Sequence, residues 1–138
     1  MKITHLYSRF PYILYIKFGK QRGYKTDRKQ VYTLFGKHGS GGGKKAGSKL
    51  NNLIAMSEVV DADVYLHSHT HTPIVHKDSF IRLNTRNNKK ITIDKLYVNS
   101  GSFLNYGGYG AEFGFTPTTT KYPKIILHTH MKMAEALL

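Results

Sequence analysis

The chain has 138 residues, of which 40% are apolar, so it has the size of one domain and can bury a core without a metal or a disulfide. The absence of cysteine excludes a disulfide scaffold and a thiolate zinc site, and leaves histidine and oxygen groups as the available metal ligands. A formal net charge of +13 favours contact with polyanions, although the cations form no long tract and accompany no recognisable nucleic-acid-binding motif. We therefore expect a single domain over residues 1–138.

The first twenty residues contain an apolar patch that Arg9, Pro11 and Lys17 interrupt. This patch is too short and too charged for a signal sequence or a membrane span, so we expect a soluble, cytoplasmic protein with no membrane contact. Alternating apolar residues predict the first strand at residues 12–18, and turn-forming residues follow it.

A second strand is predicted at residues 31–35, and it runs directly into a glycine-rich loop at 36–47. Apolar residues at helical spacing then predict a helix over residues 49–59, with Ser48 as its N-cap. The order strand, glycine loop, helix is typical of α/β proteins. The loop does not match a phosphate-binding P-loop, because His38 stands where that motif begins with glycine and Lys45 stands where it needs a hydroxyl.

The next β-rich run begins at Val64 and places His69 and His71 just beyond the carboxyl end of a strand, where sites gather in open α/β sheets. The rest of the chain has mostly strand patterns, a glycine and aromatic loop, and a tail that is expected to form a helical turn or to fray. The strands are predicted at residues 73–77, 79–84, 89–100 and 122–130, the loop at 99–120 and the tail at 131–138.

His67, His69 and His71 occupy alternate positions. On an extended segment they would project to one side, about 6.5 to 7 Å apart, so two or three imidazoles could converge on cations. The alternative is an exposed polar edge with no ligand. His128 and His130 share the spacing but lack the glycine loop and the strand-end context, so we assign them to the end of a terminal strand.

The pieces are more specific together than any one of them alone: HGSGGG at 38–43, a helix, DADVYLHSHTHTP at 61–73 and LYVNSGSF at 96–103. In this order they resemble the C-terminal half of the calcineurin-like metallophosphoesterase family, especially its phage and bacterial members. The resemblance covers residues 30–103. It implies a metal-dependent phosphoesterase, a hydrolase with two divalent metal ions (manganese, iron or zinc) held where the loops at the ends of a β-sandwich meet.

By this resemblance His38 and His69 bind one metal ion and His71 binds the other, while His67 matches no ligand position. Lys44 and Lys45 follow His38 in the loop and could attract an anionic phosphoester substrate. The alternative for these two lysines is that they are solvated loop residues.

The family's upstream motifs, D-x-H, G-D and G-N-H-[DE], do not occur before His38, and they supply the bridging aspartate and the other ligands. Three explanations stay open: a split gene whose partner chain supplies the other half, a truncated remnant, or a fold that keeps a weak metal site for another purpose. We expect weak metal binding and little or no hydrolysis by this chain alone. The expected partner is a complementary N-terminal chain or a second copy of this chain.

The competing hypothesis is a basic nucleic-acid-binding protein without catalysis. It is based on the charge and on the 10 Tyr and 7 Phe residues, whose rings can stack on bases. For the fold we expect the α/β class with mixed β-sheets, as the C-terminal half of a layered α/β/β/α metallophosphoesterase sandwich. The strands after residue 72 are expected to form its second sheet.

Overall fold

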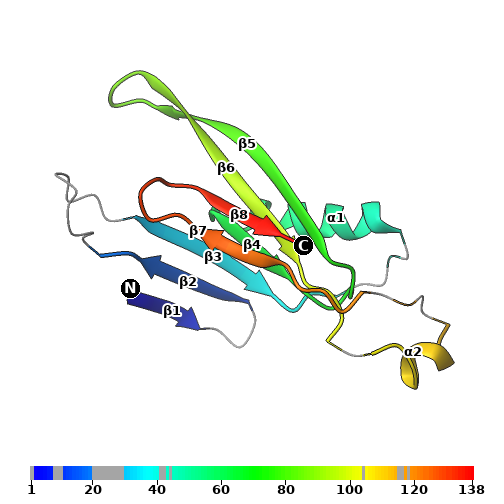
Figure 1. The fold of residues 1–138 in the computed structure, drawn as a ribbon. Coiled ribbons are helices and arrows are strands. Elements are labelled where there is room, and N and C mark those ends of the chain that lie inside the picture. The colour runs from blue at the N-terminus through cyan, green and yellow to red at the C-terminus, as the bar shows by residue number, and fades with distance from the viewer. Residues whose placement is uncertain are drawn as a thin grey trace.

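The computed structural model describes residues 2–7, 11–19, 30–40, 43, 45–103, 105–114, 117 and 119–138. In these ranges the elements follow in the order shown in Figure 1: β1 (Lys2–Tyr7), β2 (Tyr12–Lys17), β3 (Val31–Lys37), α1 (Ala46–Ile54), the 3-10 helix η1 (Ala55–Glu58), β4 (Val64–His67), β5 (Ile74–Asn84), β6 (Lys89–Asn99), α2 (Tyr109–Glu112), β7 (Lys124–Leu127) and β8 (Ala134–Leu137). The predicted strands at 12–18, 31–35 and 89–100 are confirmed to within two residues at each end.

The main sheet is mixed and has the strand order β1-β2-β3-β4-β6-β5. Neighbours pair antiparallel from β1 to β3, whereas β3, β4 and β6 run parallel and β5 returns antiparallel along β6. The parallel centre follows a helical crossover from β3 through α1 to β4, which is the connection that parallel strands require. The α/β class with a mixed sheet is therefore confirmed.

Two apolar cores lie on opposite faces of this sheet because the side chains of β3, β4 and β6 alternate between the faces. On one face Phe35, Tyr65 and Tyr97 pack against Leu53 and Met56 of the helical segment. On the other face the buried residues pack against the two-stranded sheet β7-β8; they are Tyr32, Leu34, Val64, Leu96 and Val98. The described residues thus form three layers, helix, large sheet and small sheet (Figure 1).

The strands after residue 72 do not form a separate second sheet, so this expectation is wrong. β5 and β6 join the main sheet because the buried end of β6, from Leu96 to Asn99, pairs parallel with β4. The predicted strands at 73–77 and 79–84 are one continuous strand, β5. The second sheet contains β7 and β8, and the tail forms β8 where a helical turn or fraying was expected.

Helix α1 begins earlier than predicted, and Ser48 is not its N-cap. The cap position is Lys45, whose backbone is extended, and no side chain caps the first turn. The Ser48 hydroxyl lies inside the helix and donates to the Lys45 carbonyl oxygen at 2.8 Å, so it satisfies no free N–H group. No helix in the described ranges is long and apolar enough to cross a membrane.

The Tyr32 hydroxyl joins the main sheet to the turn between β7 and β8. It donates to the His128 carbonyl oxygen at 2.6 Å and accepts from the Met133 backbone N–H at 3.0 Å. Tyr32→Phe keeps the ring but removes the hydroxyl that bonds these backbone groups, so we expect the free energy of unfolding to fall by about 1 to 2 kcal/mol. Urea unfolding followed by circular dichroism measures the change; Tyr106→Phe, which changes an exposed ring, is the control and should have no effect.

Candidate functional site

The candidate site lies at the carboxyl edge of the parallel strands. β3, β4 and β6 end side by side, with Lys37 in register with His67 and His67 in register with Asn99. The loops that leave these three strand ends therefore meet at one edge of the sheet, which is the usual position of sites in open α/β sheets. These loops carry His38 and the segment 68–72.

His38 and His69 come together across this edge although they are 31 residues apart in the sequence. The His38 Nε2 atom lies 3.3 Å from the His69 Nδ1 atom, and the two ring centroids are 5.2 Å apart with an interplanar angle of 71°. Both rings are exposed. Without a cation one ring must donate an N–H to the other, because two lone pairs at this distance repel.

The distance between these two nitrogens is also compatible with two ligands of one metal ion. Imidazole nitrogens bind a divalent transition metal at about 2.0 to 2.1 Å, so two nitrogens that subtend about 90° to 109° at the ion lie about 2.9 to 3.4 Å apart. The observed separation of 3.3 Å is within this interval. The pair can therefore supply two adjacent ligands, but two imidazoles are only part of a coordination shell.

The loop after β4 is held in an unusual backbone conformation. His69 and His71 both have positive φ, at 68° and 53°, which is uncommon for residues other than glycine and costs about 1 kcal/mol each. The Lys49 ammonium from α1 holds this loop, since it donates to the Thr70 carbonyl oxygen at 3.1 Å and to the Thr72 hydroxyl at 2.6 Å. Such retained strain is typical of functional sites.

Asn99 holds the same loop from the other side. Its Nδ2 group donates to the Thr70 hydroxyl and to the Thr72 carbonyl oxygen, while its Oδ1 atom lies 2.8 Å from Nδ1 of His67. A carbonyl oxygen only accepts, so the Thr72 contact fixes the amide orientation, and Asn99 Oδ1 must accept from a protonated His67 Nδ1. Asn99 and His67 are 1% and 3% exposed, so this contact is fully buried.

His67 is a buried ring whose Nδ1 bonds Asn99, so it differs from the exposed rings of His38 and His69. Burial lowers the pKa of His67; the Asn99 hydrogen bond opposes this shift, and the positive charge of Lys37 adds to the lowering. Its Nε2 edge faces Gly39, where an added Cβ would come within 2.1 Å of that nitrogen. Gly39 also has a φ of 87°, so the turn that carries His38 requires glycine for two reasons.

The structure brings only part of the predicted residue set together. His71 is exposed and makes no hydrogen bond or ion pair with the residues that the structure describes. Lys45 is exposed at the N-cap of α1, and Lys44 lies outside the described residues. No three His, Asp or Glu side chains in the described ranges gather closely enough to hold a metal ion.

The expected geometry of the histidine triplet is wrong. The three rings do not project from one side of an extended segment, because β4 ends at His67 and the chain turns at His69. His67 points into the protein, and His69 contacts His38 instead of its sequence neighbours. His128 and His130 lie just beyond β7, in the turn to β8, where His128 pairs with Glu135 at 3.1 Å.

Sequence reasoning did not predict the roles of Lys49 and Asn99. The role of Asn99 could have been predicted, because an amide that directly follows the apolar residues of a buried strand needs hydrogen-bond partners inside the protein. Lys49 has no such signal, because exposed lysines are common on helices and its contacts are 21 and 23 residues away.

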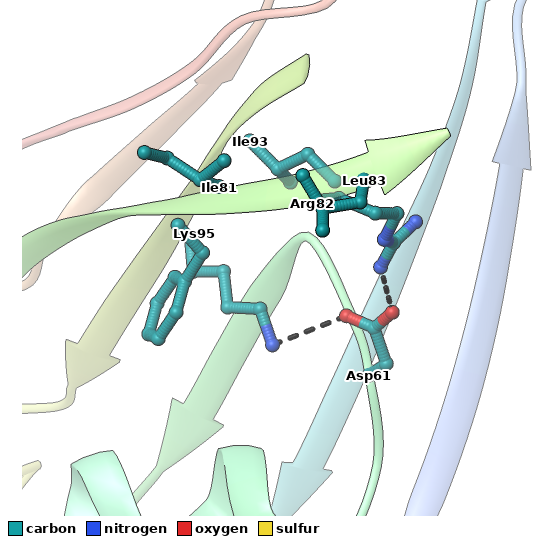
Figure 2. A pocket seen from close by; sticks show the side chains of 7 residues that line it. Asp61, Ile81, Arg82, Leu83, Ile93 and Lys95 are labelled. Carbon is teal, nitrogen blue, oxygen red and sulfur yellow. Dashed lines mark hydrogen bonds and ion pairs between the residues drawn. The ribbon is translucent and has the colours of Figure 1, made fainter. Parts of the chain in front are cut away.

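A second hollow lies beneath β5 and the loop after η1, and Figure 2 shows its lining. Asp61 pairs there with Arg82 and, at 3.1 Å, with the Lys95 ammonium, whose side chain is 10% exposed. Burial alone would raise the pKa of Asp61, but the two cations outweigh it and hold that pKa below its ordinary value. This carboxylate is fully engaged, so we assign the hollow a structural role in anchoring β5.

No protein-family model, no curated protein and no solved structure matches this chain. The function must therefore be inferred from the sequence motifs and from the geometry at the sheet edge.

Proposed function

We propose that this chain carries one part of a metal-dependent phosphoesterase (phosphoric ester hydrolase) site, in which His38 and His69 bind one divalent cation. The observation that supports this most directly is the 3.3 Å separation of their ring nitrogens, at the edge of the sheet where sites gather. The retained strain at His69 and the two anchors of its loop, Lys49 and Asn99, add support. Such anchors keep a ligand pair aligned before the cation binds.

His71 would supply a ligand to a second cation, and the other ligands, oxygen donors among them, would come from outside the described residues. Manganese, iron or zinc suits a mixed set of nitrogen and oxygen ligands. Two cations, when bound, lower the pKa of a water molecule and neutralise charge on a phosphoester.

The chain's own residues would orient the ligands and attract the substrate. His38 and His69 would supply ring nitrogens as ligands, while Lys49 and Asn99 keep the loop of His69 in place. Lys37 adds positive charge at the same edge, as its effect on the His67 pKa shows, and favours approach of an anionic phosphoester. Lys44 and Lys45 would extend this field.

We further propose that the three described layers are the C-terminal half of an α/β/β/α sandwich. The other half of this sandwich would pair with this chain. The partner would be a complementary chain that supplies carboxylates, or a second copy of this chain. It could pair with β1, which is the edge strand at one end of the main sheet. An incomplete ligand shell binds metal weakly, so we expect little hydrolysis by the isolated chain.

Metal binding is expected to depend on the histidine pair. Mn²⁺ at ten times its dissociation constant should raise the free energy of unfolding by about 1.4 kcal/mol, which corresponds to roughly 3 to 6 °C in melting temperature. His69→Ala should remove this rise. His130→Ala is the matched control, because it removes an exposed imidazole from the other H-x-H pair and should leave the rise unchanged.

The phosphoester part of the proposal needs its own measurement. Inorganic phosphate, the product of phosphomonoester hydrolysis, should bind the Mn²⁺-loaded protein in a calorimetric titration and should not bind there after His69→Ala. Turnover of a chromogenic phosphodiester by the isolated chain should stay near background. Metal binding that survives His69→Ala, or phosphate binding that ignores metal, would contradict the proposal.

A further inference from the structure

The outer half of the β5-β6 hairpin is a ribbon that extends beyond the other labelled helices and strands (Figure 1). β4 pairs with the Leu96–Asn99 end of β6, so within the described part of the chain the first seven residues of β6 pair with β5 alone. Most side chains of residues 79–92 are exposed, on both faces of the ribbon. We refer to residues 79–94 as the ribbon.

The ribbon exposes large apolar side chains to solvent. Ile81 and Leu83 are 68% and 74% exposed, and Ile91 is 44% exposed. An isolated two-stranded hairpin is marginally stable in water, so large apolar residues on it indicate contact with a partner. The ribbon contacts the rest of the protein through Asp61, which pairs with Arg82 of the ribbon and with Lys95 next to its base.

The charge of the ribbon indicates the chemistry of that partner. The ribbon contains four cations and one acidic residue, Asp94, which lies at its base and pairs with Lys77. Arg82 is paired with Asp61, but the three cations at the tip make no ion pair with any described residue; they are Arg86, Lys89 and Lys90. A polyanion is complementary to these three cations, and the net charge of +13 favours its approach.

We propose that the ribbon binds double-stranded DNA by entering a groove. A two-stranded ribbon fits the major groove, which is about 12 Å wide, and the face with Ile81 and Leu83 would meet the base edges. Residues 79–84 and their partners span roughly 20 Å at about 3.3 Å per residue, which matches about six base pairs. The tip cations would contact phosphates, and Ile81 and Leu83 would contact apolar edges such as the thymine methyl group.

This surface is separate from the histidine pair. β5 runs from Ile74, next to the histidine loop, to Asn84 at the tip, which is roughly 33 Å at about 3.3 Å per residue. The ribbon would therefore position DNA away from the cation position, and binding would not require metal.

The test uses the full chain and a fluorescein-labelled 20-base-pair DNA duplex, with fluorescence anisotropy between 50 and 200 mM NaCl in the presence of EDTA. The variant Arg86→Gln, Lys89→Gln, Lys90→Gln should weaken binding at least tenfold at 100 mM NaCl and should reduce the slope of log affinity against log salt by about 2 to 3. A control with the same change in charge replaces exposed lysines elsewhere and should weaken binding less than about threefold. Its substitutions are Lys17→Gln, Lys121→Gln and Lys124→Gln.

The apolar contact is tested separately. Ile81→Ser with Leu83→Ser should weaken binding about fivefold with an unchanged salt slope, because no phosphate contact is removed. Val59→Ser with Leu138→Ser, which removes comparably exposed apolar groups, should have no effect. Circular dichroism and thermal melting confirm that each variant is folded.

Four outcomes would overturn the proposal. They are no duplex binding at 50 mM NaCl, equal losses in the ribbon and control variants, binding to single-stranded DNA of the same length that is at least as tight, and capture by phosphatidylserine vesicles without duplex binding. Because EDTA removes metal, these outcomes leave the metal-site proposal unaffected, and failure of the metal site would leave duplex binding unchanged.

Discussion

Asn99→Ala is expected to lower the free energy of unfolding by about 3 to 4 kcal/mol. The substitution leaves the buried His67 Nδ1–H without an acceptor and removes the donors to Thr70 and Thr72. Each unpaired buried group costs about 1 to 3 kcal/mol, and the small side chain leaves a cavity in addition. Urea unfolding followed by circular dichroism measures the loss, with the slope of the transition checked for two-state behaviour.

The control for this prediction is Asn52→Ala, which changes an exposed amide on α1 and should alter stability by less than about 0.5 kcal/mol. A second readout separates loop anchoring from general stability. Under conditions where both proteins are folded, the Asn99→Ala variant should bind Mn²⁺ more weakly, because the loop of His69 loses one of its two anchors. Unchanged stability and unchanged metal binding together would show that the Asn99 network does not hold the loop.

Gly39→Ala is expected to cost about 2 to 4 kcal/mol in the free energy of unfolding. A φ of 87° is unfavourable for alanine, and the new Cβ would lie 2.1 Å from His67 Nε2, so the ring or the turn must move. Movement of the turn would shift His38, the residue next to Gly39, relative to His69. We therefore expect metal binding to fall together with stability.

The matched control is Gly47→Ala, at a position in α1 where an added Cβ meets nothing within 4 Å. This change should stabilise the protein by up to about 1 kcal/mol, since alanine is the better helix former. In a double-mutant cycle with His67→Ala, the cost of Gly39→Ala should be smaller than in the native background, because the ring that it strikes is absent. If the two costs in free energy are strictly additive, the cost of Gly39→Ala does not come from its overlap with the His67 ring.

The two proposed surfaces lie at opposite ends of one strand pair. β6 ends at the histidine edge with Asn99, which holds the loop of His69, and begins at the ribbon tip with Lys89 and Lys90. A change in one surface should leave the other intact, because the ribbon base is anchored by its own contacts to Asp61. The metal measurements and the DNA measurements can therefore be made on the same set of variants.

Local pattern predicted most elements of the sheet. Alternation and apolar runs located β2, β3, β4 and β6, because each pattern records which faces of a strand are buried and needs no knowledge of distant residues. The placement of His69 and His71 after a strand end followed in the same way. The helix boundary was less accurate, since Ser48 resembles an N-cap in sequence while its hydroxyl bonds a carbonyl oxygen within the helix.

The sequence by itself determined the α/β class, the strand-end position of the histidine loop and the basic, cysteine-free composition. Only the tertiary structure decided that β6 lies beside β4, that His69 meets His38 while His67 is buried against Asn99, and that Lys49 holds the loop. Periodicity is set by residues within one element, whereas these contacts join residues about 20 to 35 positions apart whose pairing depends on which strands become neighbours.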